Sequence, residues 1–247
     1  TSIIHDAGGL CAYDQANANA LLGVTRAKEA GFDMCFFNLH KTFSSPHGSS
    51  GPGSAAVGVT SELAKYLPVP VITRKDDTYH LDYDRPDSIG RVRDFIGNLQ
   101  VVLRSYAWCT AMGASGLREA AEVSMINQQY LTTKLEKIRG VTKPYGGKRV
   151  DQARWSLEQL KKETGFGVNE VNKRLVDYGV QTMFTSHHPW VVPEPFTPEP
   201  CETYSKADID YWAAVLEKVC EEAYKDPELI RTAPHNSSIH TADYTPL

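Results

Sequence analysis

Three short apolar runs stand out early in the chain. They cover residues 10–13, 34–39 and 55–59, and an unbroken apolar run bounded by turn residues is typical of a strand buried in a sheet. The first two runs end abruptly in polar residues, at Asp14 and at the pair His40 and Lys41. Because ligands of open α/β sheets bind beyond the carboxyl ends of the strands, we expect this acid and this amine to face one small molecule.

The rest of the chain shows mainly the three-and-four spacing of amphipathic helices. The spacing predicts helices over residues 89–110, 117–138, 152–164 and 168–178, and a last helix that begins at a capping box of Ser205 and Asp208. Gly113 and Gly116 interrupt the chain between the first two of these helices. Weaker patterns predict a helix, or a helix and a turn, over residues 16–31 and a surface hairpin or loop over residues 73–86.

Composition narrows the class of function. The 247 residues are 41% hydrophobic and 23% charged, which is typical of a globular protein. A net charge of −4 leaves no basic surface of the kind that nucleic acids or anionic membranes bind, so we expect neither as a partner. With no apolar run of roughly 18–20 residues and no signal peptide at its start, the chain is expected to be cytoplasmic.

Cysteine and histidine usage predicts no metal site and no disulfide framework. The five cysteines are widely scattered without C-x-x-C spacing, so we interpret most of them as core thiols. His187 and His188 are adjacent, and adjacent residues of an extended segment point to opposite faces, which does not suit one ion.

Lys41 and Asp14 are the residue types that pyridoxal 5′-phosphate requires. A lysine amine condenses with the cofactor aldehyde to form a Schiff base, and a carboxylate at the pyridine nitrogen keeps that nitrogen protonated so that the ring accepts electrons. Each residue alone has a simpler interpretation. Asp14 would cap a helix that starts near Ala16, and Lys41 would be one more solvated lysine.

Several motifs around these residues resemble one enzyme family. The segments H-D-A-G-G-L-C-A-Y-D-Q-A-N-A-N-A, N-L-H-K-T-F and H-G-S-S-G-P-G, followed by A-M-G-A-S-G-L-R-E-A and E-P-C-E-T-Y-S-K, resemble the P-protein of the glycine cleavage system. They are most similar to its separate β chain, subunit 2 of glycine dehydrogenase (decarboxylating). The resemblance implies the α/β fold of pyridoxal-phosphate-dependent transferases of fold type I, which is aspartate-aminotransferase-like. Residues 1–112 would then be the C-terminal part of the large, cofactor-binding domain, and residues 113–247 a small C-terminal α/β domain.

The resemblance also implies roles for individual residues. Lys41 is expected to form the Schiff base, with His40 as its catalytic neighbour and Asp14 as the partner of the pyridinium nitrogen. Ala16 and Asn17 are expected to contact the cofactor. The implied reaction is decarboxylation of glycine, after which the carbanion attacks a lipoyl disulfide on a carrier protein.

The loop expected at the substrate entrance departs from the family pattern. It comprises His47, Gly48, Ser49, Ser50 and Gly51. The family usually has H-G-G-G-G-P-G here and a cysteine after T-F, where this chain has Ser44 and Ser45. Because glycine permits close backbone approach, the serines reshape the loop. They leave open a lyase, decarboxylase or aminotransferase reaction on a different amino acid, and they leave the lipoyl carrier uncertain as a partner. A non-catalytic structural or regulatory subunit that retains the fold is a third alternative.

The chain contains no phosphate-binding signature. We find neither G-x-G-x-x-G nor a P-loop, and the related family places its phosphate-cradling turn ahead of the matching segments. Residues 1–9 also resemble the end of a helix with its glycine terminator. We therefore expect an oligomeric enzyme in which an upstream N-terminal half or an α-type partner chain completes the active site for the amino-acid substrate.

Overall fold

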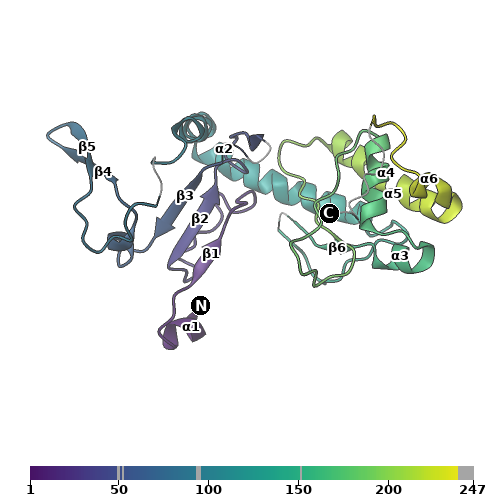
Figure 1. Ribbon diagram of the computed structural model, residues 1–247, viewed down its shortest axis with the longest axis horizontal. Helices are drawn as coiled ribbons and strands as arrows, with labels where there is room; N and C mark the ends of the chain where they lie inside the picture. The colour runs from purple at the N-terminus through teal and green to yellow at the C-terminus, as the bar shows by residue number, and fades with distance from the viewer. Residues whose placement is uncertain (49–50, 52, 93–95, 151, 239–247) are drawn as a thin grey trace, which may run out of the picture. The chain divides into compact units, whose positions relative to one another are not determined.

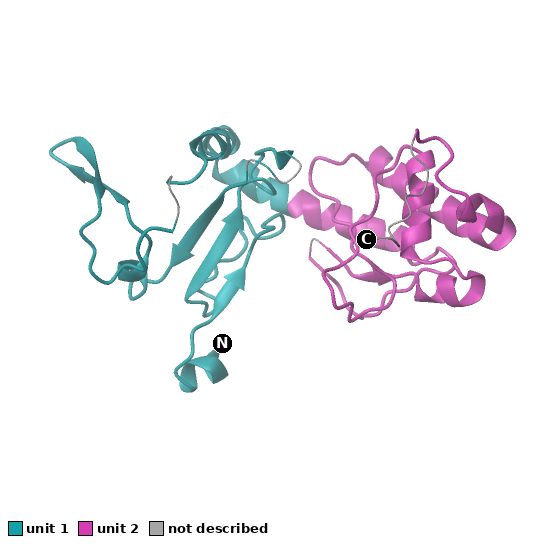
Figure 2. Cartoon of the chain, viewed as in Figure 1, with its two compact units in different colours: residues 1–121 teal, residues 122–247 magenta. Residues whose placement is uncertain are grey.

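The computed structural model describes residues 1–48, 51, 53–92, 96–150 and 152–238. The chain divides into two compact units, residues 1–121 and 122–247 (Figure 2). The domain boundary predicted after residue 112 falls within the same long helix as this division, and it stays a prediction. None of the helices in the described part of the chain has the length and apolarity that a bilayer crossing requires.

The first unit contains a three-stranded sheet in the order β1–β2–β3 (Figure 1). Strand β1 (Ala12–Asp14) runs parallel to β2 (Met34–Asn38), and β3 (Ala55–Val59) runs antiparallel to β2. The three predicted strands are therefore confirmed. Because β1 and β2 are parallel neighbours, their carboxyl ends lie at the same edge of the sheet. A short helix, α1 (Ser2–Asp6), precedes the sheet and is followed by Gly8 with a positive φ.

Two helices predicted for the first unit are wrong in part or in full. Residues 16–31 form successive turns, closed by hydrogen bonds such as that from Gly31 N to Lys28 O at 3.0 Å. Gly23 has φ 69°, which a right-handed helix cannot accommodate. The helix predicted from residue 89 begins at Leu99, because Gly90 and Gly97 are both left-handed, with φ 87° and 100°.

The segment between β3 and the long helix contains the predicted hairpin. A short 3₁₀ helix, η2 (Ala64–Tyr66), leads to the antiparallel strands β4 (Val71–Lys75) and β5 (Thr78–Asp82). Asp76 and Asp77 join the strands with φ 48° and 61°, the backbone of a type I′ turn. The segment α2 (Leu99–Leu135) consists of two helices separated by a kink at Gly113, where φ is 64° and ψ is −179°, so the interruption predicted at this glycine is confirmed.

The second unit is mainly helical around one apolar core. It contains α3 (Glu158–Thr164), α4 (Val168–Asp177), α5 (Lys206–Lys225) and α6 (Pro227–Arg231), with a two-stranded ribbon of β6 (Trp155–Ser156) and β7 (Pro195–Phe196). Ser205 caps α5 as predicted. The helix predicted over residues 152–164 is wrong in its first half, where the ribbon lies. The fully buried core side chains include Trp155, Leu160, Val171, Phe196 and Leu216.

A buried ion network ties α4 to α5 in the second unit. Arg174 Nε lies 2.8 Å from Glu222 Oε2, and its Nη1 lies 2.9 Å from Asp177 Oδ2. Asp177 Oδ1 accepts a hydrogen bond from His235 N, and Arg174 Nη1 donates to His235 Nδ1 at 3.1 Å. His235 is therefore held inside this unit by its own chain.

The cysteines differ from the sequence prediction. Only Cys220 is buried, and burial raises the pKa of its thiol to about 12, while the other four are half-buried.

Cys11 lies with His5 and Asp33, so that one potential metal-ligand atom of each falls within 4.8 Å of the others. The Asp33 carboxylate already accepts bonds from Cys11 N at 2.7 Å and His5 Nε2 at 2.9 Å, and these lower its pKa. Those bonds join α1 to the start of β2.

Candidate active site

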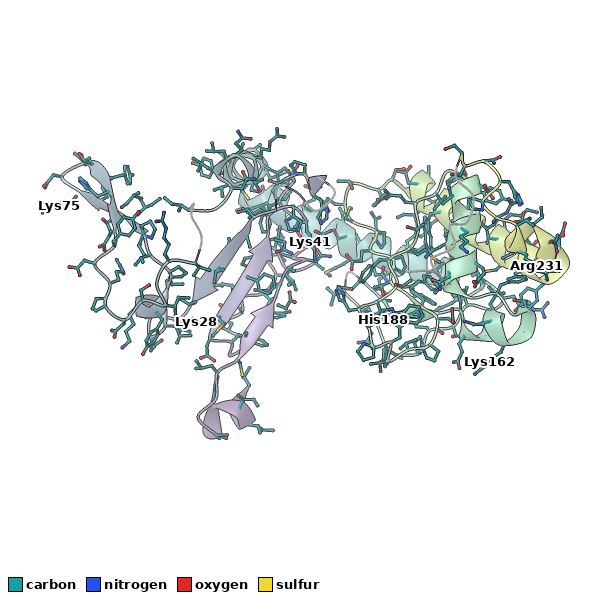
Figure 3. The ribbon with its side chains drawn as sticks, viewed as in Figure 1. Lys28, Lys41, Lys75, Lys162, His188 and Arg231 are labelled. Atoms are coloured by element: carbon teal, nitrogen blue, oxygen red, sulfur yellow. The ribbon has the colours of Figure 1, made fainter. Side chains whose placement is uncertain are left out.

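The predicted acid and amine lie at one edge of the sheet. Asp14 is the last residue of β1, and Lys41 follows β2 in a tight turn closed by a bond from Lys41 N to Asn38 O at 3.2 Å. Figure 3 shows Lys41 at the end of the first unit's sheet. Both side chains are exposed. The parallel pairing of β1 with β2 thus presents an amine and a carboxylate together, both accessible to a small molecule.

Asp14 fixes the turn that follows its own strand. Its Oδ1 accepts a hydrogen bond from Ala16 N at 3.0 Å, and Asn17 Oδ1 accepts one from Asn19 N at 3.0 Å. Such bonds to the backbone two residues on are typical of Asx turns. The alternative that Asp14 caps a helix is wrong, because turns follow it. The side-chain bond instead orients the carboxylate at the sheet edge.

A hydrogen-bonded link joins this turn to the turn of Lys41. Thr42 Oγ1 accepts a bond from Ala18 N at 2.9 Å and donates one to Asn17 Oδ1 at 3.2 Å. Thr42 is only 6% exposed, so water does not compete freely for these bonds. Sequence analysis assigned no role to Thr42. The sequence feature that could have indicated a role for Thr42 is its position directly after Lys41 in the motif N-L-H-K-T-F.

The far side of the Lys41 turn is anchored to α2. Ser45 is buried, and its Oγ donates to Val101 O at 2.9 Å and lies 2.8 Å from Ser105 Oγ. The Phe43 ring packs edge-on against Trp108, with centroids 6.1 Å apart. Ser45, noted in the sequence only as a departure from the family pattern, thus helps to hold the lysine turn.

His40 offers a hydrogen-bonding atom without a protein partner. The residue is half-buried, and its Nδ1 is fully buried with no hydrogen-bond partner among the described residues. Its ring lies edge-on to that of His47 with centroids 5.0 Å apart. Burial lowers the pKa of His40, and the positive charges of His47 and Lys41 lower it further. The lowered pKa favours the neutral form of His40, and its buried Nδ1 is left without a protein partner among the described residues.

The predicted substrate loop is described only in part. His47, Gly48 and Gly51 are exposed, and Gly51 N donates to Gly48 O at 3.1 Å. Gly48 has φ 56°, in the region that favours glycine. Ser49 and Ser50 lie outside the described residues, so the effect predicted for these two serines stays a prediction.

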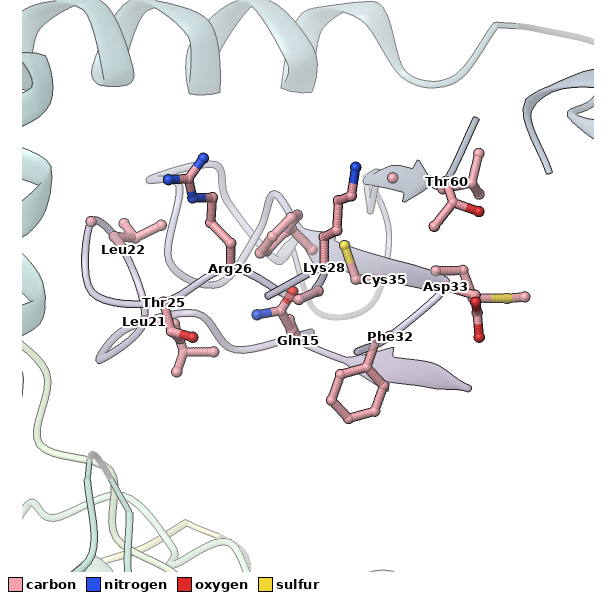
Figure 4. Close-up of a pocket in the computed structure, with 16 residues that line it drawn as sticks. Gln15, Leu21, Leu22, Thr25, Arg26, Lys28, Phe32, Asp33, Cys35 and Thr60 are labelled. Carbon is pink, nitrogen blue, oxygen red and sulfur yellow. The ribbon is translucent and has the colours of Figure 1, made fainter. Parts of the chain in front are cut away.

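A cavity that sequence analysis missed lies in the first unit (Figure 4). Its volume is about 310 Å³, and its lining includes the apolar side chains of Leu21, Phe32 and Phe37 together with Gln15. Gln15 is 2% exposed, and its Oε1 has no hydrogen-bond partner among the described residues. Neither Asp14 nor Lys41 lines the cavity. It is therefore distinct from the predicted cofactor site.

Sequence comparison relates the chain to one group of proteins. The family model for "Glycine dehydrogenase, C-terminal domain" matches residues 120–242. The chain is 44% identical over 243 residues to probable glycine dehydrogenase (decarboxylating) subunit 2 of Pyrococcus abyssi, and 45% identical over 239 residues to the protein of that name from Thermosipho africanus. The alignments cover 98% and 97% of this chain but 48% and 49% of those proteins. The chain thus spans about half the length of these curated relatives.

Structural comparison shows the fold. The crystal structure of glycine decarboxylase (P-protein) of the glycine cleavage system, in an inhibitor-bound form, matches with a TM-score of 0.72 at 18% sequence identity. The match covers 87% of this chain and 49% of that one. The match confirms the predicted α/β fold, which this chain shares with that structure. With 44% identity along almost its whole length, the chain belongs to the family of glycine dehydrogenase (decarboxylating) subunit 2.

Proposed function

We propose that this chain carries the cofactor lysine, Lys41, of a pyridoxal-phosphate-dependent enzyme that decarboxylates glycine. The placement of Lys41 and Asp14 at the carboxyl ends of two parallel strands is the observation that carries this proposal. The names of the relatives support glycine as the substrate.

The residues at the sheet edge fit pyridoxal 5′-phosphate. They include an exposed amine, an exposed carboxylate and a buried imidazole nitrogen without a protein partner. Lys41 would bind the cofactor through its amine, and Asp14 would hold a proton at the pyridine nitrogen. The bound cofactor supplies an electron-poor ring that accepts the electron pair released when glycine loses its carboxylate.

The remaining side chains would orient these two groups. Ala16 N fixes one oxygen of Asp14, which leaves the other oxygen of this carboxylate to turn toward the ring nitrogen. The ring of His40, the residue directly before Lys41, would lie beside the cofactor. In this proposal the Asn17 side chain contributes through the turn that it stabilises, and His47 and Gly48 border the substrate entrance.

We also infer that a further polypeptide segment completes the site. All five residues of β2 are only half-buried, and Val57 of β3 is 63% exposed, whereas the apolar face of a sheet is normally packed against another layer. An upstream N-terminal half or an α-type subunit would cover the sheet and supply the phosphate-binding turn. A lipoyl carrier would be the second partner in glycine cleavage.

The test of cofactor attachment uses the complete enzyme that contains this chain. After addition of pyridoxal 5′-phosphate and reduction with borohydride, mass spectrometry is expected to locate the cofactor on Lys41. Lys41→Ala should abolish attachment. Lys28→Ala, which removes an exposed lysine of the same unit, should leave attachment intact. Absence of the cofactor from Lys41 in the unaltered enzyme would refute the proposal and favour a non-catalytic subunit.

A second measurement tests the substrate. Exchange of labelled bicarbonate into glycine, dependent on a lipoylated carrier, is expected from the enzyme with the cofactor bound. The serines at positions 44, 49 and 50 favour one competing function, a reaction on a different amino acid. Cofactor on Lys41 without any exchange would support that alternative and refute glycine decarboxylation.

A further inference from the structure

Thr42 is the described residue whose side chain joins the turn of Lys41 to the turn after Asp14. Its hydroxyl accepts from Ala18 N at 2.9 Å and donates to Asn17 Oδ1 at 3.2 Å. The hydroxyl thus uses its single donor for Asn17 and one acceptor lone pair for Ala18. These two partners define its orientation. Asn17 Oδ1 also accepts from Asn19 N. The lysine turn is therefore bonded to a turn that is itself ordered.

Burial makes this link rigid. Thr42 is 6% exposed, and Ala18 beside it is fully buried. A hydrogen bond that water cannot replace is lost outright when one partner is removed, because the other partner then remains buried and unsatisfied. The anchoring of Ser45 to Val101 O holds the opposite end of the same turn. Two fixed points thus follow Lys41 in the chain, and Thr42, its immediate neighbour, is the one bonded to the turn after Asp14.

We propose that Thr42 is a positioning residue that sets the separation between the Lys41 amine and the Asp14 carboxylate, so that both reach one pyridoxal phosphate ring. This inference rests on the proposed function. A rigid aromatic ring cannot adapt to two groups that move independently, and small displacements of groups that must act together are costly. Thr42 touches neither substrate nor cofactor in this proposal, and acts through the backbone that carries Lys41.

The test compares Thr42→Val with Thr42→Ser in the complete enzyme. Valine keeps the shape and removes both hydrogen bonds, whereas serine keeps the hydroxyl. We expect Thr42→Val to raise the dissociation constant of pyridoxal 5′-phosphate about tenfold, because the lysine turn is then no longer bonded to the turn after Asp14. It should also shift the pH midpoint of the visible absorption of the bound cofactor. Thr42→Ser is expected to restore both values toward those of the unaltered enzyme.

A matched control and a cofactor-free readout separate positioning from general stability. Thr164 lies in the second unit and makes comparable bonds, donating to Leu160 O at 2.8 Å and accepting from Phe166 N at 3.2 Å. Thr164→Val should leave cofactor affinity and the pH midpoint unchanged. Without cofactor, hydrogen exchange at the Ala18 amide should be faster in Thr42→Val than in the unaltered enzyme.

The outcomes distinguish this inference from the proposed function. Unchanged affinity and pH midpoint in Thr42→Val, with cofactor still on Lys41, would overturn the positioning role alone. Equal losses in Thr164→Val and Thr42→Val would also overturn it. Absence of cofactor from the unaltered enzyme would overturn the function itself. Should Thr42→Val not fold, Thr42→Ala takes its place, since the smaller side chain leaves room for a water molecule at Ala18 N.

Discussion

Removal of Arg174 is expected to destabilise the second unit strongly, because it removes the guanidinium that two buried acids share. The guanidinium bonds Glu222 through Nε at 2.8 Å and through Nη2 at 3.3 Å, and it bonds Asp177 at 2.9 Å. The side chains of these acids are 7% and 2% exposed. Breaking a buried pair by removing one partner costs about 3–5 kcal/mol. We expect a loss of that size for Arg174→Met at neutral pH.

The loss should depend on pH with a definite sign. Burial by itself would raise the pKa of Glu222 and of Asp177, but hydrogen bonds, from Arg174 and Tyr178 to Glu222 and from Arg174 and the backbone to Asp177, outweigh it and lower both values. A depressed carboxyl pKa adds stability that is complete above the pKa of the unfolded chain and is lost as pH falls through the folded value. In Arg174→Met the bonds from the guanidinium are lost, so the pKa of both acids should rise and the carboxylates should contribute less stability at neutral pH. The difference between the two proteins should therefore shrink as pH falls.

Chemical denaturation followed by far-ultraviolet circular dichroism measures this effect at about pH 7 and about pH 4.5. The control is Lys225→Met, which removes an exposed pair with Glu221 at 2.9 Å on the surface of α5. Exposed pairs contribute little to stability, so this variant should unfold nearly like the unaltered protein. A loss for Arg174→Met no larger than for Lys225→Met, or a loss that does not shrink in acid, would refute the reasoning.

Two further substitutions test packing and backbone geometry in the second unit, both through the free energy of unfolding in denaturant. Leu216→Ala should cost about 2–5 kcal/mol, because Leu216 is 0% exposed and its removal opens a cavity in the core; a cost below that of a surface substitution would contradict the assignment of this core. Gly165→Ala should lower the free energy of unfolding by about 1–2 kcal/mol, because Gly165 ends α3 with φ 85°. An added Cβ would meet no atom within 4 Å, so the cost comes from backbone strain alone. A neutral outcome would argue against the left-handed turn.

The fold was predictable where the signal was local. Apolar runs bounded by turn residues identified β1, β2 and β3, and the capping box at Ser205 identified the start of α5. The prediction failed where a single glycine, or a segment distant in sequence, determines the secondary structure. Gly90 and Gly97 delay the start of α2 through their left-handed backbone. Trp155 lies in a strand because it pairs with Phe196, far along the chain, and no local pattern reveals such a partner.

In the candidate site, too, local patterns predicted some residues, and residues whose role depends on distant segments were missed. Asp14 and Lys41 were predicted to lie at one edge of the sheet, where the structure has them, because polar residues at the ends of parallel apolar runs emerge at a sheet edge. Thr42 and Ser45 were missed as supporting groups, because each acts through an atom of a segment distant in sequence, Ala18 N in one case and Val101 O in the other. Reactive groups can be recognised from their own chemistry. The residues that position these groups have that role only because of tertiary contacts. The proposed role of Thr42 can therefore be inferred from the structure and not from the sequence.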